Sequence, residues 1–148
     1  MNPSRRGDET EAIVLGRLMD SGVSILVPFG DSDRYDLVVE DDRELYRVQC
    51  KTGSWANGTV RFNRSTSTRT GGERVDSEYS ADEIDAYAVY APRTETVYWV
   101  PIEATGTGEM RLRVDEPKPG APRSKIHWAS DYELSARFDG RSPDNDPQ

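Results

Sequence analysis

The sequence has few of the residues that build disulfide frameworks and zinc sites, and it lacks long apolar runs. It contains one cysteine, Cys50, and one histidine, His127. A lone cysteine excludes a disulfide within the chain and fits a reducing, cytoplasmic interior. Without a cluster of cysteines and histidines, a structural zinc site is not expected. No apolar run approaches the roughly 20 residues of a membrane-spanning helix, and residues 1–12 lack the apolar segment of a signal peptide. We therefore expect a cytoplasmic protein without membrane association.

Hydrophobic residues are also scarce, at 34% of the 148 residues, while 31% are charged. The length still predicts one domain with a single core over residues 1–138. The polar, proline-containing segment 139–148 is typical of a disordered tail.

Lysine is the rare base: only Lys51, Lys118 and Lys125 are lysines, and the formal net charge is −8. An acidic surface that prefers arginine fits a protein kept soluble in high salt, so a halophilic, archaeal source is one hypothesis. An ordinary acidic protein is the other. Global acidity argues against non-specific binding to nucleic acids, which requires local positive charge.

One segment reverses this charge. Residues 51–74 contain five basic residues against the single acid Glu73, together with many serines, threonines and asparagines, whose side chains bond phosphate oxygens. A polar surface loop would share much of this composition, so both interpretations stay open. The basic residues are Lys51, Arg61, Arg64, Arg69 and Arg74.

An amphipathic helix is predicted to start at Asp8 and run to Gly22. Asp8 is a suitable N-cap, and Glu11 completes a capping-box pattern three residues later. Glu11 also shares the inward-facing side of this helix with Leu15 and Leu18, which follow it at helical spacing. The apolar run 24–29 predicts a first strand.

Residues 34–53 predict a β-hairpin, with strands 35–40 and 45–51 joined by a loop over 41–44. Alternation predicts an apolar face on which the cross-strand pairs are Val39–Tyr46, Leu37–Val48 and Tyr35–Cys50. The opposite face would pair Asp36 with Gln49 and Arg34 with Lys51.

The rest of the chain predicts further strands and a short terminal helix. The strands are expected at 58–62, at 85–92 paired with 96–102, and at a sheet edge over 109–114, with a loop from about 63 to 80 and the helix over 126–134. The fold class is therefore α+β, with a central mixed, largely antiparallel sheet flanked by helices.

The polar face of the hairpin carries the candidate chemistry. Asp36, Gln49 and Lys51 share one side, and the first helix could add Glu11. Carboxylates near a lysine can hold Mg²⁺ and a water that attacks a phosphodiester, and the backbone carbonyl of Cys50 could also reach the ion. Taken singly, each residue has a simpler explanation: Glu11 as a capping residue, Asp36 as a partner of Arg34, and Lys51 as a solvated strand end.

The chain resembles the PD-(D/E)XK nuclease superfamily, and most closely the branch of archaeal Holliday junction resolvases and bacterial group I intron homing endonucleases. The resemblance rests on GDETEA, RYDLVV, VQCKTG, DAYAVYAP and TVYWVP, and spans most of residues 7–102. It implies a restriction-endonuclease-like α/β core and dependence on Mg²⁺, for which Mn²⁺ substitutes. It also implies a homodimer or homotetramer that cuts duplex or branched DNA.

The resemblance also implies roles for individual residues. Asp36 matches the central acid, Lys51 the lysine and Glu11 the acid of the first helix, while Arg61, Arg64, Arg69 and Arg74 would grip the DNA backbone. Gln49 stands where the pattern has Glu or Asp, which lowers the charge of the site. Two alternatives therefore remain: a catalytically silent DNA-binding or assembly module on the same fold, and a structural partner protein with a solvated polar face.

Overall fold

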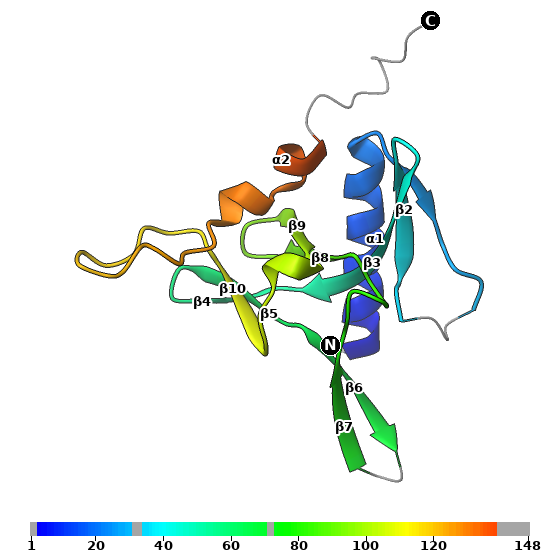
Figure 1. Ribbon diagram of the computed structural model, residues 1–148, viewed down its shortest axis with the longest axis horizontal. Coiled ribbons are helices and arrows are strands. Elements are labelled where there is room, and N and C mark those ends of the chain that lie inside the picture. Colours follow the sequence, from blue (N-terminus) through cyan, green and yellow to red (C-terminus); the bar gives the residue numbers. More distant parts are fainter. Residues whose placement is uncertain (1–2, 31–33, 71–72, 139–148) are drawn as a thin grey trace, which may run out of the picture.

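A long helix lies against a five-stranded sheet in the computed structural model, which describes residues 3–30, 34–70 and 73–138 (Figure 1). The helix is α1 (Pro3–Asp20). The sheet order is β1-β2-β3-β8-β9, with only β3 and β8 parallel among its neighbouring strands. The strands are β1 (Ser24–Leu26), β2 (Leu37–Asp41), β3 (Glu44–Thr52), β8 (Ala86–Ala91) and β9 (Thr96–Pro101). The predicted α+β class with a mixed, largely antiparallel sheet is confirmed.

Two smaller sheets extend this core. One has the order β10-β5-β4, and the other is a hairpin of β6 and β7 that projects from the body of the molecule (Figure 1). Their strands are β4 (Ser54–Ala56), β5 (Thr59–Asn63), β6 (Ser65–Thr70), β7 (Glu73–Glu78) and β10 (Glu109–Arg113). The predicted loop after residue 62 is therefore wrong for most of its length, since its residues pair as β6 and β7.

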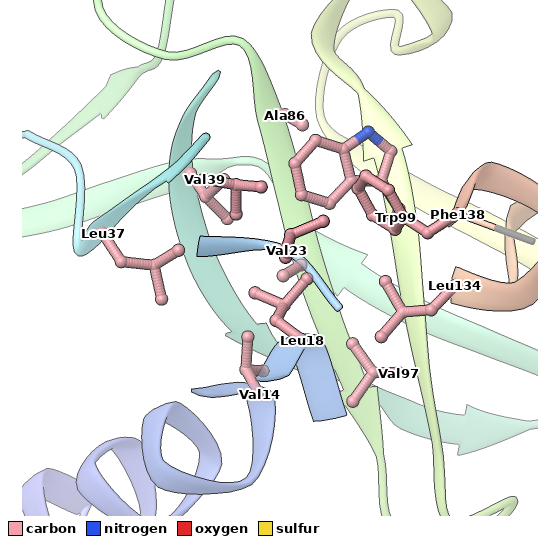
Figure 2. Packing of buried hydrophobic residues seen from close by; sticks show 12 residues of the cluster. Val14, Leu18, Val23, Leu37, Val39, Ala86, Val97, Trp99, Leu134 and Phe138 are labelled. Carbon is pink, nitrogen blue, oxygen red and sulfur yellow. The ribbon is translucent and has the colours of Figure 1, made fainter. Parts of the chain in front are cut away.

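Alternation along β8 and β9 separates two cores. Ala86, Ala88, Val97 and Trp99 face α1, whereas Tyr87, Val89, Tyr98 and Val100 face β5 and β10. Both faces of these central strands are buried, as expected for strands covered on two sides. Figure 2 shows the first core, with Trp99 and Phe138 above Leu18 and Val14 of α1. The Trp99 and Phe138 rings meet edge to face, with their centroids 5.2 Å apart.

The hairpin of β2 and β3 has the predicted register, with Leu37 opposite Val48 and Val39 opposite Tyr46. Its turn is tighter than the predicted loop, because Asp41 pairs with Glu44 and only residues 42 and 43 turn, both at positive φ. That geometry matches the right-handed twist of the paired strands.

The predicted pairing of Tyr35 with Cys50 is wrong. The ladder stops at Leu37, and Tyr35 packs in the core next to β5 while Cys50 packs in the core next to α1. The paired part of the two strands therefore ends next to Asp36.

Two predictions about helices are also corrected. Helix α1 begins at Pro3, so Asp8 is an exposed residue within the helix rather than its N-cap, and Glu11 closes no capping box. Proline fits a first helical turn because its missing N–H would have no partner there. The predicted helix 126–134 is instead a 3-10 turn, η2 (Ala129–Tyr132), followed by α2 (Leu134–Phe138). A second 3-10 turn, η1 (Ile102–Ala104), follows β9.

The predicted tail 139–148 lies outside the described residues. Among the helices of the described part, none has the length and apolarity needed to cross a membrane.

Candidate active site

Asp36 lies where β2 and β3 separate. Its N–H donates to the Val48 carbonyl at 2.8 Å, and its Oδ2 accepts the N–H of Cys50 at 2.9 Å. The carboxylate thus replaces a backbone acceptor at the point where the ladder ends, and this satisfies a buried donor. The hydrogen bond to Cys50 holds Asp36 beside β3, so its partner is the Cys50 backbone rather than the predicted side chain of Gln49.

Glu11 on α1 faces the same place. Burial is the main factor that raises the pKa of Glu11, and the charge of Asp36 raises it further, followed by that of Asp8. Burial likewise raises the pKa of Asp36, while the Cys50 hydrogen bond and Lys51 oppose this shift. Two partly desolvated carboxylates therefore repel each other across the junction of helix and hairpin.

Lys51 completes the cluster from β3. Its Nζ donates to the Ser65 carbonyl at 2.7 Å and lies 5.6 Å from the centre of the Tyr79 ring. Burial lowers the pKa of Lys51, and the nearby charge of Asp36 raises it. The ammonium is thus half-buried, held by residues at the two ends of the β6–β7 hairpin, and within electrostatic reach of Asp36.

Tyr79 is a site residue that the sequence patterns do not predict. The Arg34 guanidinium lies over the same ring, 4.4 Å from its centre, and pairs with Glu83 at 3.1 Å. The predicted neighbours Arg34 and Lys51 therefore meet through an aromatic ring rather than as a cross-strand pair. No spacing in the sequence signals this, because Tyr79 follows the whole β6–β7 hairpin.

Gln49 and Cys50 occupy the remaining part of the site. The Gln49 amide donates to the Cys50 carbonyl at 3.4 Å. Burial raises the pKa of the Cys50 thiol, whose side chain packs in the core with α1. The thiol is thus a packed group, as predicted, while the carbonyl of the same residue lies on the side of Gln49.

These donors form a set of hard oxygens of the kind that Mg²⁺ and other hard divalent cations prefer. They are the carboxylates of Glu11 and Asp36, the Cys50 carbonyl and, after a half turn of its amide, the side-chain oxygen of Gln49. Within the described residues, no group of three or more His, Cys, Asp and Glu side chains could hold a metal. The repulsion between the two carboxylates nevertheless favours binding of a divalent cation. The residues present therefore fit such an ion, although they supply fewer negative charges than three acids would.

Of the predicted DNA-binding arginines, the structure describes the side chains of Arg61 and Arg64. Arg64 is 4% exposed, and its guanidinium donates to the Gly108 carbonyl at 2.9 Å and to Thr105 at 3.3 Å. This burial argues against the predicted DNA contact of Arg64. Arg61 lies on β5, and Arg69 is opposite Arg74 on the hairpin, where their side chains are outside the described part. The hairpin strands also carry Glu73, Asp76 and Glu78, so the hairpin has no net positive charge.

Comparison with known proteins identifies the family. A bacterial homing endonuclease, I-Ssp6803I, has a similar structure, with a TM-score of 0.73 and 22% identity over 93% of this chain and 92% of that one. A Holliday junction resolvase, Hjc of the archaeal hyperthermophile Archaeoglobus fulgidus, aligns with a TM-score of 0.45 and 15% identity over 73% of this chain and 84% of that one. No curated protein matches the sequence. The family model of the PD-(D/E)XK endonucleases matches residues 1–135, and the chain belongs to this family.

Proposed function

We propose that this protein is a Mg²⁺-dependent endonuclease that hydrolyses phosphodiester bonds in DNA, with Mn²⁺ as an effective substitute. One observation carries the proposal: the half-buried Lys51 and Asp36 are both fixed by hydrogen bonds to the backbone and lie within electrostatic reach of each other, and Asp36 in turn repels Glu11 of the adjacent helix. Paired carboxylates beside a lysine are the donor set of a metal-assisted hydrolase.

Each residue has a role in this proposal. Asp36 and Glu11, with the Gln49 amide oxygen and the Cys50 carbonyl, would hold a divalent ion, which would supply positive charge to offset that of the phosphate. Lys51 orients the attacking water and stabilises the negative charge that develops on the phosphate. Asp36 keeps the Lys51 ammonium directed into the site, and the Ser65 carbonyl and the Tyr79 ring limit its motion.

Gln49 supports the competing proposal of a catalytically silent DNA-binding module. An amide in place of a carboxylate removes one negative charge from the metal site, which weakens its attraction for a divalent ion. The two functions share the fold and differ only in whether this site cuts DNA.

Cleavage of both DNA strands favours at least two copies of a domain of this size, so we also propose a homodimer or homotetramer. The apolar residues after β1 support this proposal: Val27 is 63% exposed and Phe29 fully exposed. Exposed apolar clusters of this kind mark contact surfaces. The single cysteine favours a cytoplasmic location.

The proposed function is tested by incubating the protein with supercoiled plasmid and with four-way junctions, in Mg²⁺, in Mn²⁺ and in EDTA, at low and high salt. The endonuclease proposal predicts cutting of at least one substrate with either metal, no cutting in EDTA, and loss of cutting in Lys51→Met. DNA binding without cutting under every condition would establish the silent module instead. A protein that neither binds nor cuts DNA would contradict both.

A further inference from the structure

We propose that the outer face of β5 and β10 is a second binding surface for the phosphates of duplex DNA, beside the candidate active site. This β5–β10 face consists of Arg61 and Asn63 from β5 and Glu109, Arg111 and Arg113 from β10. The inference rests on the proposed function, since it concerns the same DNA. The basic residues of β10 lie outside the basic segment 51–74 that the sequence singles out.

The pleat of the two strands explains why these side chains share a face. Val60, Phe62, Met110 and Leu112 are buried in the core, so the alternate residues point outward. Arg61 and Arg111 are direct cross-strand partners. The outer face of a sheet edge is thus occupied mainly by arginines, in a chain whose net charge is −8.

This arrangement is electrostatically unfavourable for the protein alone. Like charges directly opposite each other destabilise a strand pair. Glu109 is the nearby compensating acid, 3.4 Å from Arg111 and 3.9 Å from Arg61, and it is itself about half exposed. Arg61 and Arg111 share this carboxylate, while Arg113 donates to the Asn57 carbonyl at 3.0 Å. A row of phosphates would supply further negative charge to this face.

A hollow of about 340 Å³ lies beside these strands. The segment that follows the Pro-rich connection closes it, because the Arg113 N–H donates to the His127 carbonyl at 2.8 Å. This segment adds Lys125 and His127 to the lining, which otherwise includes Glu109, Arg111 and Arg113. Glu109 is the only acid among the described residues that line the hollow, so the positive charge of the lining is not balanced locally.

The β5–β10 face is continuous with the candidate active site. Asn63 ends β5, and its Oδ1 accepts the N–H of Ser65 at 3.0 Å. The Ser65 carbonyl in turn accepts a hydrogen bond from the Lys51 ammonium at 2.7 Å. Ser65 follows Arg61 by four positions, a span of at most about 14 Å. With about 3.4 Å per base pair, a duplex whose scissile phosphate lies at Lys51 would bring phosphates some four base pairs away onto this face.

The test measures the affinity of the full-length protein for a fluorescent duplex oligonucleotide across a salt series, in EDTA so that no cleavage occurs. Arg111→Ala and Lys125→Ala are compared with wild type, singly and together. Arg123→Ala is the matched control, because Arg123 has similar exposure to Arg111 (57% against 61%), also pairs with a glutamate, and does not line the hollow.

We expect the double variant to weaken binding at low salt. The slope of log affinity against log salt should fall by about 0.9 for each phosphate that the double variant no longer neutralises. Arg123→Ala should behave as wild type.

Equal slopes for wild type and the double variant would overturn the inference. An effect of Arg123→Ala on the slope equal to that of Arg111→Ala would also overturn the inference, because that result would indicate only a change in total charge. Absence of DNA binding by wild type would overturn it together with the proposed function. Normal plasmid cutting with an unchanged slope would overturn the inference alone.

Discussion

Asp36 has a structural role, but its negative charge also lowers the stability of the fold. Its carboxylate satisfies the Cys50 N–H where the β2–β3 ladder ends, but it is desolvated and repels Glu11. Placing a partly buried negative charge beside another lowers stability unless a cation offsets it. A metal-binding hydrolase needs this arrangement, whereas a purely structural cluster would favour a neutral residue at this position.

This cost predicts the effect of Asp36→Asn on stability. Because the pKa of Asp36 is raised in the folded state above 3.8, folding favours its protonated form, and wild-type stability falls as pH rises through the folded-state pKa. Asparagine keeps an oxygen acceptor for the Cys50 N–H but carries no charge. In EDTA, Asp36→Asn should therefore melt at a higher temperature than wild type at neutral pH, and the difference should vanish below pH 3.8. Thermal unfolding across pH checks this, and equal melting temperatures at neutral pH would contradict it.

Tyr79 is expected to act through Lys51. Its ring contacts both the Lys51 ammonium and the Arg34 guanidinium, and a contact of this kind stabilises a cation by about 1–2 kcal/mol when partly desolvated. Tyr79→Leu should lower the single-turnover cleavage rate roughly tenfold, in line with that energy, with little change in DNA affinity.

Tyr79→Phe is the matched control, since it keeps the ring and removes only the hydroxyl. It should cleave at nearly the wild-type rate. An equal decrease in the Leu and Phe variants would show that the hydroxyl, and not the ring, matters.

At the scale of elements, the strand that carries Lys51, β3, is followed at Gly53 by a tight contact with β5 and β8. A methyl group on Gly53 would approach Val60 of β5 at 2.6 Å and Val89 of β8 at 3.1 Å. The close approach of these strands thus requires glycine immediately after the strand that carries Lys51.

Gly53→Ala is therefore expected to destabilise the protein by about 1–3 kcal/mol, as overpacking of a core does. Gly16→Ala is the control, because nothing lies within 4 Å of a methyl group there and the position is helical. It should stabilise by about 0.5–1 kcal/mol. Urea unfolding of both variants measures the difference, and a neutral Gly53→Ala would show that β5 can move away from β3.

The elements that were predictable from sequence are those with local signals. The period-two pattern of β2 and β3 predicted their register, and the run from Asp85 to Ile102 predicted β8 and β9 with their turn. The start of α1 was missed because Asp8 is a typical N-cap residue, whereas the helix continues through the exposed residues before it back to Pro3. The β6–β7 hairpin was missed because serine and threonine are as common in loops as in exposed strands.

The sequence does not predict the long-range contacts. The local sequence around Arg64 is typical of a surface base, yet its hydrogen bonds to Thr105 and Gly108 join segments about forty residues apart. Tyr79 likewise reaches Lys51 only after the chain has returned from the hairpin. The acids and the lysine of the site were predictable because helical and strand periodicity place them on known faces. The residues that hold the lysine were not.

For the whole molecule, charge separates into an acidic body and a cationic β5–β10 face. A net charge of −8 repels DNA at long range, so binding depends on the local surfaces around Lys51 and Arg111. Salt screens the general repulsion and the local attraction alike, which makes the salt series informative about both.

We propose that the junction of α1 with the β2–β3 hairpin is a phosphodiesterase site. The most direct measurement compares the rates at which wild type, Asp36→Asn and Asp42→Asn nick supercoiled plasmid in Mg²⁺ or Mn²⁺. Asp42 is the control, since it undergoes the same chemical change in the same hairpin, is exposed, and has a positive φ that asparagine tolerates. We predict that wild type and Asp42→Asn cut at similar rates, while Asp36→Asn is at least about a hundredfold slower. Cutting by Asp36→Asn at the wild-type rate would contradict the account.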